Sequence, residues 1–260
     1  MNSRVQTVET AASAGASVAK SYFDSNLAVD VKSDKTDFVT TADLSAQRRV
    51  IEELRTDFTE DLIVAEEGES QKHPNSTGTC FVVDPIDGTN NFVRSIPLWA
   101  TSVAFLQDGE CVAASTVAPL GFGTFVADER GARRDGDSIS VSDRSDPELC
   151  DVVPTLWWDY DDRDQYSSVC EGITRRFADL KRYGSTQLEL AFLATGQIDA
   201  VVTNRQGPAW DTVAGVHLVR QAGGTVTDIY GDRWTHESEG LVASNGKIHQ
   251  IALECVNLTI

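Results

Sequence analysis

The sequence contains few residues from which a disulfide framework or a zinc cluster could be built. Its five cysteines are scattered and odd in number, and no two form a C-x-x-C pair, so neither feature is suggested. We expect these thiols to be buried as small hydrophobic groups. Long apolar runs are also missing, and the first twenty residues lack the basic-then-apolar pattern of a signal peptide. The sequence therefore predicts a cytoplasmic protein with no membrane partner.

Basic residues are the second shortage, because 22 Lys and Arg stand against 40 Asp and Glu, a formal net charge of −18. This charge repels nucleic acid and anionic membranes, so neither is expected as a partner. The acidic residues are spread along the chain and indicate a solvated acidic surface. With lysine scarce relative to arginine, such a surface would suit the salty cytoplasm of a halophile. A small anionic substrate could approach only where bound cations reverse the local field.

The length of 260 residues and the apolar content of 41% are sufficient for a sizeable core. We expect one compact unit made of two closely packed halves, residues 1–145 and 146–260. In the first half, apolar periodicity and turn residues predict helices over 5–23 and 44–58, strands over 62–65 and 80–83, antiparallel strands over 99–126 and more strand near 138–142.

Residues 142–164 are polar and rich in aromatics, and we expect them to connect the two halves. In the second half, the same signals predict helices over 166–180, 184–197 and 211–224, and strands over 198–203, 225–231 and 240–245. Helices and strands alternate throughout, while the middle of the chain is antiparallel. The fold class is therefore α+β or a layered α/β architecture.

The stretch "CFVVDPIDGTNNF" places two carboxylates, Asp84 and Asp87, around a proline at the end of an apolar strand. Pro85 favours extended geometry at Asp84, and Gly88 tolerates backbone angles that other residues avoid. We therefore expect both acids on a sharply turning loop where the strand ends. Carboxylates this close repel one another unless a cation lies between them. Asp, Pro and Gly also form ordinary surface turns, so this stretch alone does not decide.

Further acids stand at comparable positions elsewhere in the chain. Glu66 and Glu67 follow the strand over 62–65, and Asp211 opens a predicted helix, where it could simply cap free N–H groups. Oxygen ligands without nearby Cys or His pairs indicate a hard cation such as Mg²⁺, which also binds substrate phosphate.

"DPIDGTNNF" and the later "WDTVAGVHLVRQAGG" resemble the paired signatures of the inositol monophosphatase family, the lithium-sensitive, Mg²⁺-dependent sugar phosphatases. "KSDKTDFVTTAD", "VAEEGES" and "YGSTQLELAFLATGQIDAVV" are further similarities, so the resemblance spans about residues 11–245. It implies a layered αβαβα sandwich of the sugar phosphatase type, with the metal site between the halves. It also implies two or three Mg²⁺ per site, a small phosphorylated metabolite as substrate, and a homodimer.

The resemblance also implies roles for single residues. Glu66, Asp84, Asp87, Asp211 and the carbonyl of Ile86 correspond to metal ligands; Thr89 and Glu66 correspond to the groups that position the attacking water, with Asp43 behind them. The main-chain N–H groups of Gly88, Thr89 and Asn90 would hold the phosphate. The implied reaction is metal-assisted in-line hydrolysis of a phosphate monoester.

The substrate side departs from the family pattern. Asn204 stands where animal members carry a glutamate that binds inositol hydroxyls, and the following Arg205 could pair with a second phosphate or form an ion pair on the acidic surface. Gly184 and Ser185 fall where the family lines the sugar site, although they could equally mark a helix boundary. Ser95 replaces a glycine of the turn that usually follows the first signature.

Three substrates agree with these residues: inositol monophosphate first, fructose 1,6-bisphosphate second, and nucleotide-derived bisphosphates third. A non-catalytic relative that keeps only the fold is the alternative of a different class. Such a protein would be expected to lose a metal ligand or the water-positioning threonine, and this chain has them all.

Overall fold

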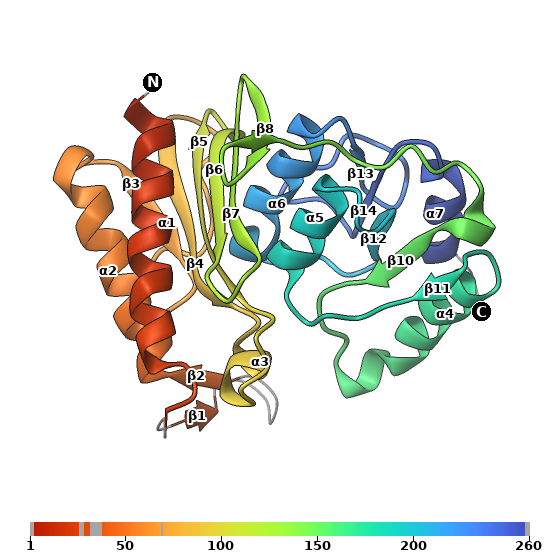
Figure 1. Cartoon of the computed structure of the whole chain (residues 1–260), viewed down its shortest axis with the longest axis horizontal. Coiled ribbons are helices and arrows are strands. Elements are labelled where there is room, and N and C mark those ends of the chain that lie inside the picture. Colours follow the sequence, from red (N-terminus) through yellow and green to blue (C-terminus); the bar gives the residue numbers. More distant parts are fainter. Residues whose placement is uncertain (1–2, 26–28, 32–37, 69, 258–260) are drawn as a thin grey trace.

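The computed structural model describes residues 3–25, 29–31, 38–68 and 70–257 (Figure 1). Its helices are α1 (Ser3–Tyr22), α2 (Thr41–Asp57), α3 (Thr89–Val93), α4 (Arg163–Thr174), α5 (Thr186–Ala194), α6 (Ala209–Gln221) and α7 (His249–Val256). Its strands are β1 (Val29–Val31), β2 (Phe38–Thr40), β3 (Leu62–Ala65), β4 (Thr79–Asp87), β5 (Ala100–Gln107), β6 (Glu110–Ala118), β7 (Gly123–Asp128), β8 (Gly131–Arg134), β9 (Asp137–Ser138), β10 (Asp151–Pro154), β11 (Asp179–Leu180), β12 (Ala200–Thr203), β13 (Thr225–Thr227) and β14 (Leu241–Ser244).

The larger sheet has seven strands in the order β3-β4-β5-β6-β7-β8-β9. Strands β3 and β4 are parallel, and every other neighbouring pair is antiparallel. Alternate side chains of β4 enter different cores: Cys80 and Val82 pack with α5 and α6, whereas Phe81 and Val83 pack with α1 and α2. A strand buried on both faces in this way has the continuous apolar run seen in its sequence.

The second sheet has five strands in the order β11-β10-β12-β14-β13. It packs one face on α5 and α6, through Val201, and the other on α4 and α7, through Ala200 and Val202. The layers therefore run α1/α2, large sheet, α5/α6, small sheet, α4/α7 (Figure 1). The predicted layered αβαβα sandwich is confirmed.

Three sequence expectations about the middle of the chain were wrong. Residues 139–142 belong to no strand, because the chain leaves the large sheet there and Val141 donates its N–H to the carbonyl of Ala222 after α6. Residues 142–164 are more than a connection, since they contain β10, the strand between β11 and β12. The helix predicted over 166–180 ends earlier, at Thr174. The last two residues of the predicted range, Asp179 and Leu180, form β11 instead.

The remaining predictions concern cysteines, membrane spans and one motif. All five thiols are free; Cys80, Cys150 and Cys255 are buried, and Cys111 and Cys170 are half-buried. Within the described residues, none of the helices is both long and apolar enough to cross a bilayer. In the motif "KSDKTDFVTTAD", residues 32–37 lie outside the described residues, while its last residues form β2 and the first turn of α2.

Candidate active site

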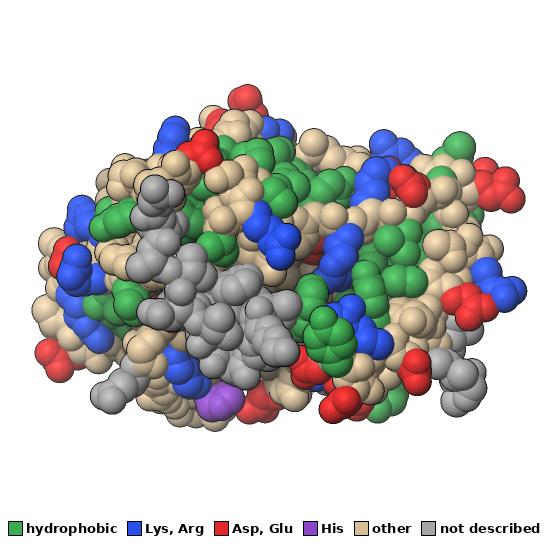
Figure 2. All heavy atoms as spheres, turned by 90° about the horizontal axis from the view of Figure 1, so that it is seen from below, with side chains coloured by type: hydrophobic (Ala, Val, Ile, Leu, Met, Phe, Trp, Pro, Cys, Tyr) green, Lys and Arg blue, Asp and Glu red, His purple; other side chains and the backbone are tan. Residues whose placement is uncertain are grey.

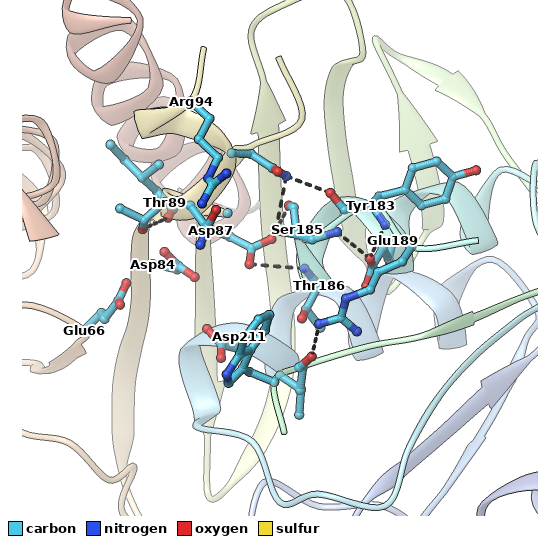
Figure 3. Close-up of a pocket in the computed structure, with 18 of the residues that line it drawn as sticks. Glu66, Asp84, Asp87, Thr89, Arg94, Tyr183, Ser185, Thr186, Glu189 and Asp211 are labelled. Atoms are coloured by element: carbon cyan, nitrogen blue, oxygen red, sulfur yellow. Dashed lines mark hydrogen bonds between the residues drawn. The ribbon is translucent and has the colours of Figure 1, made fainter. Parts of the chain in front are cut away.

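Glu66 and Asp84 meet because two parallel strands end side by side. The β3–β4 register pairs Ala65 with Val83, so the next residue of each strand emerges at the same edge of the sheet. The N–H of Glu66 donates to the carbonyl of Val83 at 3.3 Å, which ties the turn to β4. Both carboxylates project into one pocket (Figure 3).

Strand β4 does not end at Asp84, contrary to the sequence expectation. It continues to Asp87 with a register shift against β5 between the two acids, because the extra residues bulge out of the ladder. The Thr101 hydroxyl donates to the Pro85 carbonyl at 2.7 Å and holds this bulge. Gly88 then takes a φ of +93°, where a Cβ would lie 2.9 Å from the Leu98 carbonyl oxygen. Only glycine fits this corner.

Asp211 comes from the other half of the chain. It lies in the first turn of α6 and does not open the helix as expected, because α6 begins at Ala209 with Pro208 at its N-cap. One carboxylate oxygen each from Asp84, Asp87 and Asp211 lies within 4.8 Å of the other two. The structure thus brings Glu66 beside Asp84, Asp87 and Asp211 (Figure 3). These are the four carboxylates that the resemblance gives as metal ligands.

The electrostatics of this cluster fit a bound cation. Asp84 is only 1% exposed, and no hydrogen-bond donor among the described residues reaches either of its carboxylate oxygens. Burial raises the pKa of Asp84 well above its usual value, and the nearby Glu66, Asp87 and Asp211 raise it further. Burial likewise raises the pKa of Asp87 to about 6. A buried acid without donors, facing other acids, is the oxygen-only donor set that suits a hard divalent cation.

Thr89 and Asp43 form a pair behind the cluster. The Thr89 hydroxyl lies 3.3 Å from a carboxylate oxygen of Asp43 and 2.9 Å from the Ile86 carbonyl, so it can donate to either. The other Asp43 oxygen accepts from the N–H and hydroxyl of Thr40, the reciprocal cap that starts α2. Asp43 is fully buried and does not line the pocket, whereas Ile86 and Thr89 do.

Asp87 has a second set of contacts that the sequence did not reveal. Its carboxylate accepts hydrogen bonds from the Ser185 hydroxyl and from the N–H groups of Thr186 and Gln187, at 3.2 and 2.7 Å for the last two. It thereby neutralises the N-terminus of α5. Ser185 is also the N-cap of α5, so the helix boundary and the pocket wall are formed by the same residues.

The pocket above these groups has a volume of about 630 Å³. Besides the predicted Gly88, Asn90, Gly184 and Ser185, it is lined by residues that sequence reasoning missed, including Asn91, Arg94, Leu156, Trp157, Asp159, Arg182, Tyr183, Thr186 and Glu189. Asn91 follows Thr89-Asn90 in the signature and bonds the carbonyls of Leu98, Tyr183 and Gly184. The exposed ring of Trp157 stands at the pocket wall.

Asn204 and Arg205 are not brought into the pocket, contrary to the substrate-binding expectation. The Asn204 side-chain oxygen accepts from the Trp158 indole at 2.8 Å. The Arg205 guanidinium forms ion pairs with Asp159 and Asp162, which is the surface ion pair that the sequence left open as the alternative. Glu67 also stays out of the pocket: its side chain is buried and its main chain is bonded in both directions by the Gln47 amide.

The layered sandwich, with its carboxylate cluster between the halves, is a fold of the sugar phosphatase type. Residues 1–257 match the family model described as "Inositol monophosphatase family", and the chain belongs to this family. It is 34% identical over 230 residues to "Fructose-1,6-bisphosphatase/inositol-1-monophosphatase" of Thermotoga maritima, covering 88% of this chain and 86% of that protein. It is 32% identical over 250 residues to "Inositol-1-monophosphatase" of Bacillus subtilis, covering 93% and 91%.

Other relatives carry a different name or have solved structures. "Nus factor SuhB" of Escherichia coli is 29% identical over 245 residues, covering 93% of this chain and 90% of that protein. Among solved structures, an IMPase of Thermotoga maritima superposes with a TM-score of 0.85 at 30% identity, covering 98% and 95% of the two chains. The extragenic suppressor protein suhB of Bartonella henselae gives 0.88 at 28% identity, covering 98% of each chain.

Proposed function

We propose that this chain is a Mg²⁺-dependent phosphomonoester hydrolase of a small phosphorylated polyol or sugar, with inositol monophosphate as the first candidate. The observation that carries the proposal is the convergence of Asp84, Asp87 and Asp211 from both halves of the chain on one point. The pocket floor also contains Glu66 and Thr89, and their position beside the three aspartates supports the roles that we propose for them in holding metal and orienting water. A family member that had lost catalysis would have no need to keep a buried carboxylate without donors.

Different residues of the pocket would carry out different parts of the reaction. When bound at the carboxylates, two or three Mg²⁺ would neutralise phosphate charge and lower the pKa of a water molecule. The main-chain N–H groups of Gly88, Thr89 and Asn90, where α3 begins, would donate to phosphate oxygens. The Thr89 hydroxyl, donating to Asp43, would offer a lone pair to orient the attacking water, and Glu66 would accept its proton. Water attacks phosphorus in line, the ester P–O bond breaks, and the alcohol leaves with a proton from solvent.

Fructose 1,6-bisphosphate is the second candidate, and one observation favours it. Arg94 extends toward the pocket (Figure 3), and its guanidinium forms no ion pair or hydrogen bond with any described residue. An unpaired cation on such an acidic chain would suit a second phosphate. The Thermotoga maritima relative, whose name includes both activities, supports keeping the two substrates together. Nucleotide bisphosphates remain a third candidate.

Relatives named "Nus factor SuhB" raise the alternative of a non-catalytic role. The complete set of Glu66, Asp84, Asp87, Thr89 and Asp211 supports catalysis in this chain.

The test is release of inorganic phosphate from inositol, fructose, histidinol and adenosine phosphates, with and without Mg²⁺. We expect Mg²⁺-dependent turnover, fastest with inositol monophosphate. Arg94→Gln should lower kcat/KM for fructose 1,6-bisphosphate about tenfold or more while changing inositol monophosphate hydrolysis little. No phosphate release from any of these substrates at saturating Mg²⁺ would overturn the proposal.

A further inference from the structure

Lys72 fixes the main chain of Glu66 although it is not part of the pocket. After the turn that follows β3, Gln71 returns to pair with Val64, and this brings Lys72 back beside the end of the strand. Its ammonium group donates to the Glu66 carbonyl at 2.5 Å and to the Ala65 carbonyl at 3.0 Å. Since the Glu66 N–H is already bonded to Val83, both polar groups of the Glu66 main chain are held. The direction in which the Glu66 side chain leaves the backbone is thereby fixed.

The same ammonium group reaches the other half of the molecule. Lys72 Nζ lies 5.5 Å from the centre of the Trp210 ring, a cation–π distance. Trp210 is the residue directly before Asp211, in the first turn of α6. Its carbonyl accepts from the buried Gln187 side chain at 2.6 Å, and the Gln187 N–H donates to Asp87. Lys72 on one side and Gln187 on the other therefore hold the turn that carries Asp211.

We propose that Lys72 is a positioning residue of the metal centre, which sets the placement of Glu66 relative to Asp211 by holding the Glu66 carbonyl and the Trp210 ring. The inference rests on the proposed Mg²⁺-dependent function. It contrasts with a purely electrostatic role for Lys72, because the two roles have opposite signs. A positive charge beside a cation site weakens cation binding, so a lysine that acts only through its charge would give tighter Mg²⁺ binding when removed. A positioning lysine would give weaker binding when removed.

The experiment measures thermal stabilisation of the protein as Mg²⁺ is titrated, without substrate. Lys72→Met keeps an unbranched side chain that is one atom shorter and removes its charge and donors. We expect its half-maximal Mg²⁺ concentration to rise about tenfold or more over wild type. Lys72→Arg should restore part of the affinity, because a guanidinium keeps the charge, the donors and the ring contact. Lys247→Met is the matched control, since it removes the same charge from an exposed lysine of the connection between β14 and α7, and it should leave the midpoint unchanged.

A second variant, Trp210→Leu, removes the ring and leaves the charge of Lys72 in place. It should also raise the half-maximal Mg²⁺ concentration. The double variant should have a half-maximal concentration no higher than that of the more impaired single variant, because both changes break the same connection. If Lys72→Met does not fold, Trp210→Leu decides alone, and a wild-type midpoint overturns the inference. An unchanged or lower midpoint in Lys72→Met overturns it directly. A wild-type protein that shows no Mg²⁺ stabilisation would contradict the proposed function itself, whereas a normal wild-type response with unaffected variants contradicts only the role of Lys72.

Discussion

Thr89 is the residue whose single hydroxyl group separates a catalytic from a structural role. Its contacts with Asp43 and Ile86 place that hydroxyl at the pocket floor. Thr89→Ala should lower kcat by on the order of 10²- to 10⁴-fold and change KM much less, because main-chain amides and metals would still hold the phosphate. Thr89→Ser keeps the hydroxyl and should retain much more activity. Steady-state kinetics beside a thermal melt checks this: a lower melting temperature with unchanged kcat would make Thr89 only a structural residue of the turn.

Ser95 is a residue whose conformation does not suit its side chain. It adopts a φ of +56°, in the left-handed region that glycine occupies without strain, and the resemblance to the family places a glycine at this position. Ser95→Gly should therefore raise the free energy of unfolding by up to about 1 kcal/mol. Ser76→Gly, at an exposed serine whose φ is not positive, should lower it by a few tenths of a kcal/mol. If urea unfolding showed that both variants lose the same free energy of unfolding, the strain argument would be contradicted.

The convergence of the carboxylates could be predicted from the sequence, but the rest of the pocket lining could not. Asp84 and Asp87 lie in a signature whose proline and glycine restrict the backbone locally, so their convergence follows from a few adjacent residues. Arg205 and Arg94 show the limit. Each is an arginine in a loop, and only the folded chain decides that Arg205 meets Asp162 while Arg94 extends into the pocket. Long-range packing determines such directions, and spacing along the sequence carries no signal for them.

At the scale of elements, Asp84 and Asp87 have opposite effects on the fold. Asp84 is buried, has no donor among the described residues and faces three other carboxylates, so in the absence of Mg²⁺ Asp84→Asn should raise the melting temperature. Asp87 accepts three hydrogen bonds at the start of α5 on its two oxygens. Asn keeps only one accepting oxygen, so Asp87→Asn leaves part of the helix start unpaired. This should lower the free energy of unfolding by roughly 1 to 3 kcal/mol, even though burial makes the charge itself unfavourable there.

Both variants should lose most phosphatase activity. Calorimetry with a chelator present is the measurement, and stabilisation of both variants would show that Asp87 does not hold α5. Carboxylate repulsion alone predicts that Asp87→Asn leaves the fold intact or steadier, and the hydrogen bonds that Asp87 accepts from α5 reverse that prediction.

The β7–β8 turn provides a prediction about pH. The Asp128 carboxylate is buried, which alone would raise its pKa, but hydrogen bonds from Arg130 and Arg133 outweigh burial and hold the pKa well below its usual value. A carboxyl with a lowered native pKa stabilises the fold above its unfolded pKa of about 4, and this stabilisation is lost as the pH falls through the native pKa. Asp128→Asn should therefore cost roughly 1 to 3 kcal/mol from pH 8 down to pH 5, and less below about pH 4. A difference that grows on acidification would contradict this assignment.

Elements with a clear period could be predicted, and short ones could not. Strand β3 was predicted at Leu62–Ala65 with its observed bounds, because an apolar run there is bounded by acids. Strand β10 was missed because its four residues, Asp151–Pro154, lie among polar and aromatic neighbours and are recognisable only by their pairing with β11 and β12. The bulge in β4 was also missed, since it depends on the register against β5.

At the scale of the whole molecule, the site depends on how the two halves pack. The first half supplies Glu66, Asp84 and Asp87, and the second supplies Asp211 (Figure 3). The surface seen from below carries basic and acidic side chains interspersed with exposed apolar groups (Figure 2).

The resemblance to the family leads us to expect a homodimer, and a monomeric mass by light scattering in high salt would contradict that expectation.

The central claim is that the carboxylates of both halves form one metal centre against which a phosphate is held. Its most direct measurement is a crystal structure with Mn²⁺ in place of Mg²⁺ and inorganic phosphate, using the anomalous signal of the metal to locate it. We predict anomalous peaks among Asp84, Asp87 and Asp211, with phosphate against the main-chain N–H groups of residues 88–90. Peaks elsewhere, or none at saturating Mn²⁺, would contradict the account.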